Sequence, residues 1–243
     1  MQSWGDLMNL TYAVADLHGA HDLLELALSA VDRHAAAASA GTRAVVFLGD
    51  YVDRGPGSRQ IIERLMFGPP DGWRWLCLKG NHEDIMLAAL GGHIGASYWR
   101  EVGGAETLAS YGSNAQIADE MRAAVPAENV AWIRALPPLA VDKHRVFVHA
   151  GVDPTLRLED QDEQTLIWSR DSNGLGHDGR FVVHGHTPHR NGPVTNGQSI
   201  DLDTLAWHTG RLVVGVFDDD QKGGPVDRLE VRRHTAGTLP IET

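Results

Sequence analysis

Residue types that bind metal ions occur in five short blocks of the sequence, each directly after a run of apolar residues. The blocks are Asp16-Leu17-His18-Gly19, Gly49-Asp50-Tyr51-Val52-Asp53-Arg54-Gly55, Gly80-Asn81-His82-Glu83, His149-Ala150-Gly151 and His184-Gly185-His186-Thr187. Carboxylate, amide and imidazole ligands without a thiolate suit manganese, iron or zinc. One block alone is a weak signal, because an Asp-x-His pair often only caps a helix. Five blocks in this order predict one shared metal site.

The apolar runs before the blocks predict buried strands, and helical patterns separate the first three of them. The strands predicted in this part of the chain lie at 10–15, 44–48 and 73–78. The helices predicted there begin after Gly19 and cover 58–66 and about 83–90. This alternation favours parallel strands covered by helices. Because ligands of open α/β sheets bind at the carboxyl ends of the strands, we expect the five loops to converge.

The middle of the chain has no strand pattern. Glycines interrupt a mainly helical stretch from Gly91 to Pro138, which we interpret as a helical insert (about 91–138) within a single domain of 1–243. After Gly185 the pattern becomes all-β. The strands predicted in the second half lie at 146–148, 181–183, 199–203, 211–217 and 228–232.

Composition excludes several classes of protein. The 243 residues carry a formal charge of −11, the opposite of the balance expected for a general nucleic-acid binder. An anionic substrate must therefore meet a local positive site. Cys77 is the single cysteine, so no intrachain disulfide can form. No apolar run reaches the ~18 residues of a membrane span, and no basic residue precedes Arg33, so we expect a cytoplasmic protein without a membrane partner.

The five blocks resemble the phosphoprotein phosphatase branch of the calcineurin-like metallophosphoesterases, most of all the small bacterial and lambda-phage Ser/Thr/Tyr protein phosphatases. The resemblance runs from Asp16 to Thr187 and more loosely to Phe217. Ala15 stands where the family usually has glycine, which is a small change of size. The resemblance implies an α/β fold: a four-layer α/β/β/α sandwich of two mixed sheets with a helical cap insert.

The resemblance also implies two divalent metal ions that share Asp50. The residues implied for the first ion are Asp16, His18 and Asp50. Those implied for the second are Asp50, Asn81, His149 and His186. Manganese is the expected metal, with zinc or iron as alternatives. Two ions about 3.5–4 Å apart turn a bridging water into hydroxide near neutral pH, which would attack phosphorus without forming a phosphoenzyme. For His184 two roles remain open: that of a metal ligand, and a place in the core or around the ligands.

The remaining polar residues of the blocks receive roles from the same resemblance. Arg54 and Arg170 resemble phosphate clamps, and Asn81 would also contact the substrate phosphate. His82 would be the general acid, oriented by Asp53. We expect Glu83 to begin the following helix, where a carboxylate interacts favourably with the helix dipole. Four aromatic residues could line a substrate groove, although core packing is the default for each: Tyr98, Trp99, Trp132 and Trp168.

These residues leave three functions to compare. The first is a metal-dependent serine/threonine protein phosphatase, with phosphotyrosine as a further candidate substrate. Its partner would be a phosphoprotein or a small phosphoester. The second is a symmetrical dinucleoside tetraphosphate hydrolase. That family typically departs at the second and third blocks, with Asp after Asn-His, so Asp53-Arg54-Gly55 and Glu83 favour the first function. The third is an inactive module that binds phosphate or a partner. Such a module would have lost a ligand or His82, and none is missing.

Overall fold

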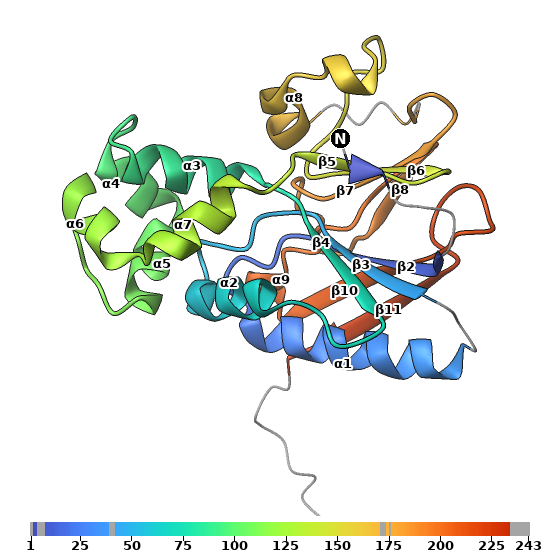
Figure 1. Ribbon diagram of the computed structural model, residues 1–243, viewed down its shortest axis with the longest axis horizontal. Helices are drawn as coiled ribbons and strands as arrows, with labels where there is room; N and C mark the ends of the chain where they lie inside the picture. Colours follow the sequence, from blue (N-terminus) through green and yellow to red (C-terminus); the bar gives the residue numbers. More distant parts are fainter. Residues whose placement is uncertain (1, 4–7, 39–41, 171–173, 175, 234–243) are drawn as a thin grey trace, which may run out of the picture.

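The computed structural model describes residues 2–3, 8–38, 42–170, 174 and 176–233. Two mixed β-sheets pack face to face, and helices cover both outer faces (Figure 1). The predicted four-layer sandwich is therefore confirmed. Within the described ranges, no helix is both long and apolar enough to cross a lipid bilayer.

The five-stranded sheet has the order β11-β10-β2-β3-β4. Its strands are β2 (Met8–Val14), β3 (Thr42–Phe47), β4 (Trp73–Cys77), β10 (Arg211–Asp218) and β11 (Asp227–Arg232). β2, β3 and β4 run parallel, as the strand–helix alternation predicted, whereas β10 runs antiparallel to both of its neighbours.

The six-stranded sheet has the order β1-β5-β6-β7-β9-β8. Its strands are β1 (Gln2–Ser3), β5 (Leu139–Val141), β6 (Arg145–Val148), β7 (Phe181–His184), β8 (Val194–Asn196) and β9 (Ser199–Asp201). β6, β7 and β9 are parallel. Both sheets thus contain a block of parallel strands whose carboxyl ends can carry ligands.

The central strand β2 shows why the apolar runs are continuous. Its alternate side chains face different layers, because successive residues of a strand point to opposite faces. Tyr12 and Val14 pack in the cluster that contains helices α1 (His21–Ala37) and α2 (Ser58–Phe67). Ala13 packs between the two sheets with residues such as Phe147. On the opposite outer face, helix α8 (Glu163–Trp168) covers the six-stranded sheet.

The predicted insert is helical, as expected, and lies at one end of the sandwich (Figure 1, left). Its elements, with the helix that leads into it, are α3 (Asn81–Leu90), α4 (Ala96–Trp99), the π-helical turn η1 (Arg100–Gly104), α5 (Ala105–Ser110), α6 (Ala118–Ala124) and α7 (Ala127–Arg134). The π-turn bends at Gly103, which has φ 121°. A Cβ atom at position 103 would lie 2.6 Å from the backbone nitrogen of Arg54, so glycine permits the close approach of the two segments.

The expectation of an all-β carboxyl-terminal part is wrong at one place. A short helix, α9 (Ala206–Thr209), connects β9 to β10. Four residues make only one turn, which is too short to produce a helical periodicity in the sequence. Another short helical element, the 3-10 turn η2 (Leu158–Asp160), lies earlier in the chain, before α8 and outside the part expected to be all-β.

Candidate metal centre

The five loops converge at the carboxyl ends of parallel strands from both sheets. Loops after β2, β3 and β4 carry the first three blocks, and loops after β6 and β7 carry the last two. The residues implied as metal ligands are all buried: Asp16, His18, Asp50, Asn81, His149 and His186. Burial of this many polar groups is costly unless they are paired or bind a metal.

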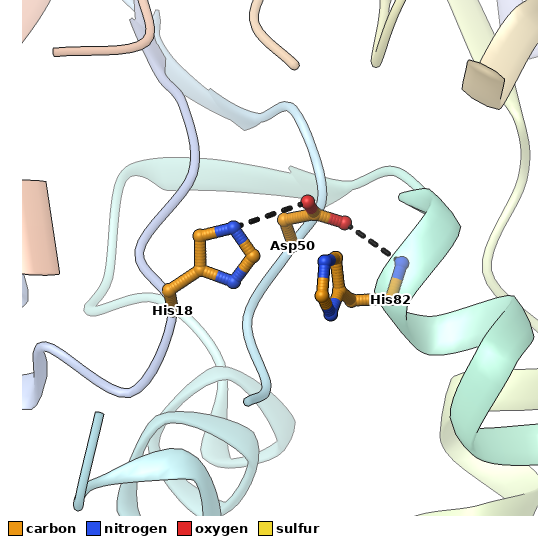
Figure 2. Close-up of side chains that lie close together, drawn as sticks. All are labelled: His18, Asp50 and His82. Carbon is orange, nitrogen blue, oxygen red and sulfur yellow. Dashed lines mark hydrogen bonds and ion pairs between the residues drawn. The ribbon is translucent and has the colours of Figure 1, made fainter. Parts of the chain in front are cut away.

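Asp50 belongs to both of two close groups of ligand atoms. One group is His18, Asp50 and His82, and the other is Asp50, His149 and His186; in each, the ligand atoms lie within 4.8 Å of one another. Figure 2 shows His18 and His82 on either side of the Asp50 carboxylate. A carboxylate shared by two groups is what a dinuclear site requires.

Two histidine rings are fixed in the tautomer that a metal ligand needs. His18 donates its Nδ1–H to the carbonyl of Val52, and His149 donates its Nδ1–H to the carbonyl of Leu48, both at 2.9 Å. Burial lowers the pKa of each ring, so both imidazoles are neutral. Each Nε2 therefore presents a lone pair toward the centre.

These lone pairs face other acceptors. His18 Nε2 lies 3.3 Å from Asp50 Oδ2, and His149 Nε2 lies 3.5 Å from Asp50 Oδ1. His149 Nε2 is also 3.0 Å from Asn81 Oδ1. Acceptors that face one another without a proton repel, and a cation between them removes the repulsion. The donor set thus fits divalent ions with mixed nitrogen and oxygen ligands.

Asp16 lies beside the two close groups of described residues rather than within them. Its carboxylate accepts the backbone N–H of His186, at 3.2 and 3.1 Å. Burial, together with the charges of Asp203 and Asp50, raises the pKa of Asp16 well above its usual value. Three buried carboxyls in one region are another reason for bound cations. Sequence analysis missed Asp203, although it follows the end of β9 just as the predicted ligands follow their strands.

Backbone strain is concentrated in the predicted site. Among the described non-glycine residues with left-handed φ, six of eight are site residues, with φ between 40° and 72°: Asp16, His18, Asp50, Asp53, Arg54 and His186. Such conformations cost about 1–3 kcal/mol each and cluster at functional sites. Close packing adds a steric demand, because a side chain at Gly80 would lie 2.3 Å from Asp50 Oδ1. The glycine of the Gly-Asn-His block therefore makes room for the shared carboxylate.

Both ring nitrogens of His82 form hydrogen bonds with neighbouring side chains. Its Nδ1 is 2.7 Å from Asp53 Oδ2, and its Nε2 is 2.9 Å from Arg54 Nη2. A guanidinium only donates, so Nε2 accepts from Arg54 and the Nδ1–H donates to Asp53. Burial opposes protonation, but the charges of Asp50 and Asp53 outweigh it and raise the pKa of His82. This arrangement suits a proton donor.

The helical insert holds Asp53. Thr107 donates its hydroxyl to Asp53 Oδ1 at 2.8 Å, and Trp99 donates its indole N–H to both carboxylate oxygens. The backbone N–H of Asp53 donates to the hydroxyls of Thr107 and Ser58. Trp99 is fully buried, so the default expectation of core packing is correct for it, but its indole nitrogen also orients a site residue. The sequence contains no local signal for these long-range contacts.

Glu83 joins the second and third blocks. It lies in the first turn of α3, as expected, and is completely buried. Its carboxylate accepts the backbone N–H groups of Asp50 and Tyr51, both at 2.8 Å, and of Gly80 at 2.9 Å. Glu83 therefore positions the loop of the shared carboxylate, and its side chain is not exposed to substrate.

The other predicted positions lie at the margin of the site. Arg170 is exposed. Burial and, to a lesser extent, the charges of His149 and Arg170 lower the pKa of His186 to about 4. Trp168, also exposed, meets the His186 ring edge to face at 6.2 Å. His184 lies outside both close groups of described residues, with its Nδ1 3.7 Å from Asp201 Oδ2.

Comparison of the sequence with known proteins gives a family and one curated relative. A family model for calcineurin-like phosphoesterases matches residues 11–215. The symmetrical bis(5'-nucleosyl)-tetraphosphatase of Janthinobacterium sp. (strain Marseille) is 33% identical over 145 residues. The match covers 59% of this chain and 44% of that protein, so the chain spans less than half the length of this relative.

Solved structures with the same fold include enzymes for different substrates. A structure provisionally assigned as a diadenosine tetraphosphatase superposes with a TM-score of 0.66 at 20% identity, covering 95% of this chain and 96% of that one. A serine/threonine phosphatase of Saccharomyces cerevisiae, similar to human phosphatase PP5, gives a TM-score of 0.57 at 15% identity, covering 98% and 82%. A cold-active protein-tyrosine phosphatase of Shewanella sp. gives 0.55 at 16% identity, covering 95% and 83%. At these identities the likeness concerns the fold alone.

Proposed function

Because this chain belongs to the calcineurin-like phosphoesterases, which are metal-dependent phosphoester hydrolases, we propose that its five loops form a dinuclear hydrolytic centre. The residues proposed for the first ion are Asp16, His18 and Asp50. Those proposed for the second are Asp50, Asn81, His149 and His186. The observation that carries the proposal is the set of unprotonated acceptors that face one another around Asp50.

The chain's own residues supply the proton chemistry. When bound, two divalent ions supply the nucleophile by lowering the pKa of a water molecule, and they draw charge from the phosphoryl oxygens. The oxygen derived from water would form a bond to phosphorus while the bond from phosphorus to the leaving oxygen breaks, and His82 would donate a proton to that leaving oxygen. Asp53 stabilises the positive charge that His82 carries before the transfer.

Arg54 couples substrate binding to this proton. In the structure the Arg54 guanidinium donates a hydrogen bond to His82 Nε2. A phosphoryl oxygen competes for the same donors, and arginine binds phosphate oxygens in a bidentate fork. Substrate binding thus frees Nε2 to carry the proton that the leaving oxygen needs. Arg170, near His186, is the second proposed clamp.

For the substrate, we favour a dinucleoside polyphosphate, with a phosphoprotein as the second candidate. Two sequence features favoured a protein phosphatase, Asp53-Arg54-Gly55 and Glu83. Glu83 is buried in a loop contact, where its side chain does not meet a substrate. The curated relative, which is 33% identical over the matched 145 residues, favours a dinucleotide. Asp53-Arg54-Gly55 keeps the protein phosphatase as a candidate.

A substrate panel tests both levels of the proposal. The protein is stripped with a chelator, reloaded with manganese, zinc, iron or magnesium, and assayed on diadenosine tetraphosphate, a phosphoserine peptide, a phosphotyrosine peptide and an aryl phosphate. We expect activity only after reloading and the highest kcat/KM on the dinucleotide. Greater turnover of a phosphopeptide would reverse the order of the candidates. Full activity of the stripped protein, or none with any metal, would refute the centre itself.

A further inference from the structure

A cleft lies beside the proposed metal centre, next to the loop that carries Arg54. Its volume is about 410 Å³, within the range of small-molecule sites. Arg54 forms one boundary and Trp207, on helix α9, another; Gln60 and Arg233 also line it. Arg54 is the residue of the proposed centre that lines this cleft, and neither the sequence patterns nor the proposed centre assigns a role to Trp207, Gln60 or Arg233.

Arg54 connects the cleft with the proton donor. One guanidinium nitrogen is 2.9 Å from His82 Nε2, and the guanidinium carbon lies 5.9 Å from the centre of the Trp207 ring. A proton donor lies on the side of the leaving group, since that is the oxygen it protonates. A leaving group that continued from His82 past Arg54 would reach Trp207.

The walls of the cleft suit a flat, polar ring. Gly19, Gly55 and Gly57 line it and pack so closely that a side chain at Gly19 would lie 2.3 Å from the Gly55 carbonyl oxygen. At these three positions the wall is backbone without a side chain, which a planar ligand can approach. Gln60 is exposed and offers an amide to the edge of a heterocycle. An unsubstituted phenyl ring has no group that could use such a partner.

The charges of the cleft suit a ring that is joined to phosphates. Arg233 forms two hydrogen bonds with Asp22, at 2.5 and 2.9 Å, so these two charges compensate each other. Arg54 remains as the positive group that faces both the centre and the cleft. The cleft therefore offers an aromatic surface next to a phosphate-binding arginine, as nucleotide sites do.

We propose that the cleft between Arg54 and Trp207 binds the nucleobase of the leaving group, with the ring stacked on Trp207 and the edge of the base at Gln60. This inference rests on the proposed hydrolase and deepens it, since it assigns a nucleotide as the leaving group. A phosphotyrosine ring is the competing occupant and is one outcome of the test.

Binding of ADP, measured by calorimetry on the metal-loaded protein, tests the subsite without turnover. Loss of a base–aromatic stack costs about 1–3 kcal/mol. We therefore expect Trp207→Leu to weaken ADP binding about tenfold, and Trp207→Phe to retain most of it. Inorganic phosphate should bind all variants within about twofold of each other. Phe67→Ala removes an exposed aromatic side chain outside the cleft and is the matched control.

Gln60→Ala is a second variant, on an exposed position of α2, in case Trp207→Leu does not fold. We expect it to weaken ADP binding about threefold. Equal affinity of ADP and phosphate in the wild type, or equal losses for both ligands in Trp207→Leu, would overturn the subsite while leaving the hydrolase intact. A Trp207→Leu loss confined to the phosphotyrosine peptide would also overturn it. Failure of the hydrolase itself appears separately, as absence of turnover on every substrate.

Discussion

Trp99 of the helical insert donates its indole N–H to both carboxylate oxygens of Asp53, at 3.0 and 3.2 Å. Asp53 in turn contacts His82 at 2.7 Å. The insert therefore does more than extend one end of the sandwich, because it sets the position of the carboxylate behind the proposed acid. Burial already raises the pKa of Asp53, and the donors from Trp99 and Thr107 oppose that rise.

Trp99→Phe should lower kcat while retaining the packing of the ring. The substitution removes one donor to a buried carboxylate, so Asp53 becomes less able to stabilise a protonated His82. We expect about a tenfold loss on a phosphoserine peptide. The measurement is kcat together with metal content, which should not change. Thr107→Val removes the other donor and should act in the same direction; loss of metal in either variant would mean that the insert supports the ligands instead.

His82→Asn should slow the reaction by an amount that depends on the leaving group. An alkoxide leaves poorly and needs the proton, so we expect a loss of about 10²–10⁴-fold on a phosphoserine peptide. An aryl phosphate leaves well unaided, and its loss should be smaller. Asp53→Asn should show the same trend more weakly. Steady-state rates on both substrates check this, and equal losses would assign His82 to phosphate binding only.

Asp50→Asn should remove both ions, because Asp50 belongs to both close groups of ligand atoms. Elemental analysis of the purified protein should show loss of both metals, and the melting temperature should fall toward that of the chelated wild type. Asp201→Asn is a suitable control, since it changes a buried carboxyl outside those two groups. Retention of two ions by Asp50→Asn would refute the shared carboxylate.

Glu83→Gln should weaken both stability and metal binding. Oε2 of Glu83 accepts from Asp50 and Gly80, and Oε1 accepts from Tyr51 and Val52. The amide nitrogen that replaces one of these oxygens cannot accept a hydrogen bond, so one of the two pairs loses its acceptor. A buried N–H without a partner costs about 1–3 kcal/mol. Urea unfolding of metal-free protein measures this cost directly. Unchanged stability together with altered substrate preference would show that Glu83 selects substrate after all.

Asp201 should make the stability of the metal-free protein depend on pH. Burial raises the pKa of Asp201 from 3.8 to about 9. Between these values the folded protein keeps a proton that the unfolded chain has released, so the free energy of unfolding falls as the pH rises. His184, whose pKa burial lowers to about 4, stays neutral over most of this range. Urea unfolding at pH 5 and pH 8 should show a smaller difference for Asp201→Asn than for the wild type.

The amino-acid sequence is sufficient to predict that the loops of the first three blocks lie side by side, whereas the roles of their residues as metal ligands stay a prediction. Asp16, Asp50 and Asn81 each follow an apolar run, and the carboxyl ends of parallel strands lie at one edge of a sheet. The order of strands and helices along the chain therefore brings these side chains together. The two mixed sheets were expected from the family resemblance, and the helical insert from the lack of a strand pattern in the middle of the sequence.

How those residues are held depends on the tertiary structure. Trp99 and Thr107 reach Asp53 across 46 and 54 residues of sequence, and Glu83 reaches back 33 residues to Asp50. The cleft beside Trp207 likewise joins α9 to the loop that carries Arg54. Sequence patterns report periodicities of a few residues, because they arise from the local geometry of one helix or strand. Contacts between distant segments depend on how whole elements pack, and this packing determines the orientation of the acid and the space offered to a leaving group.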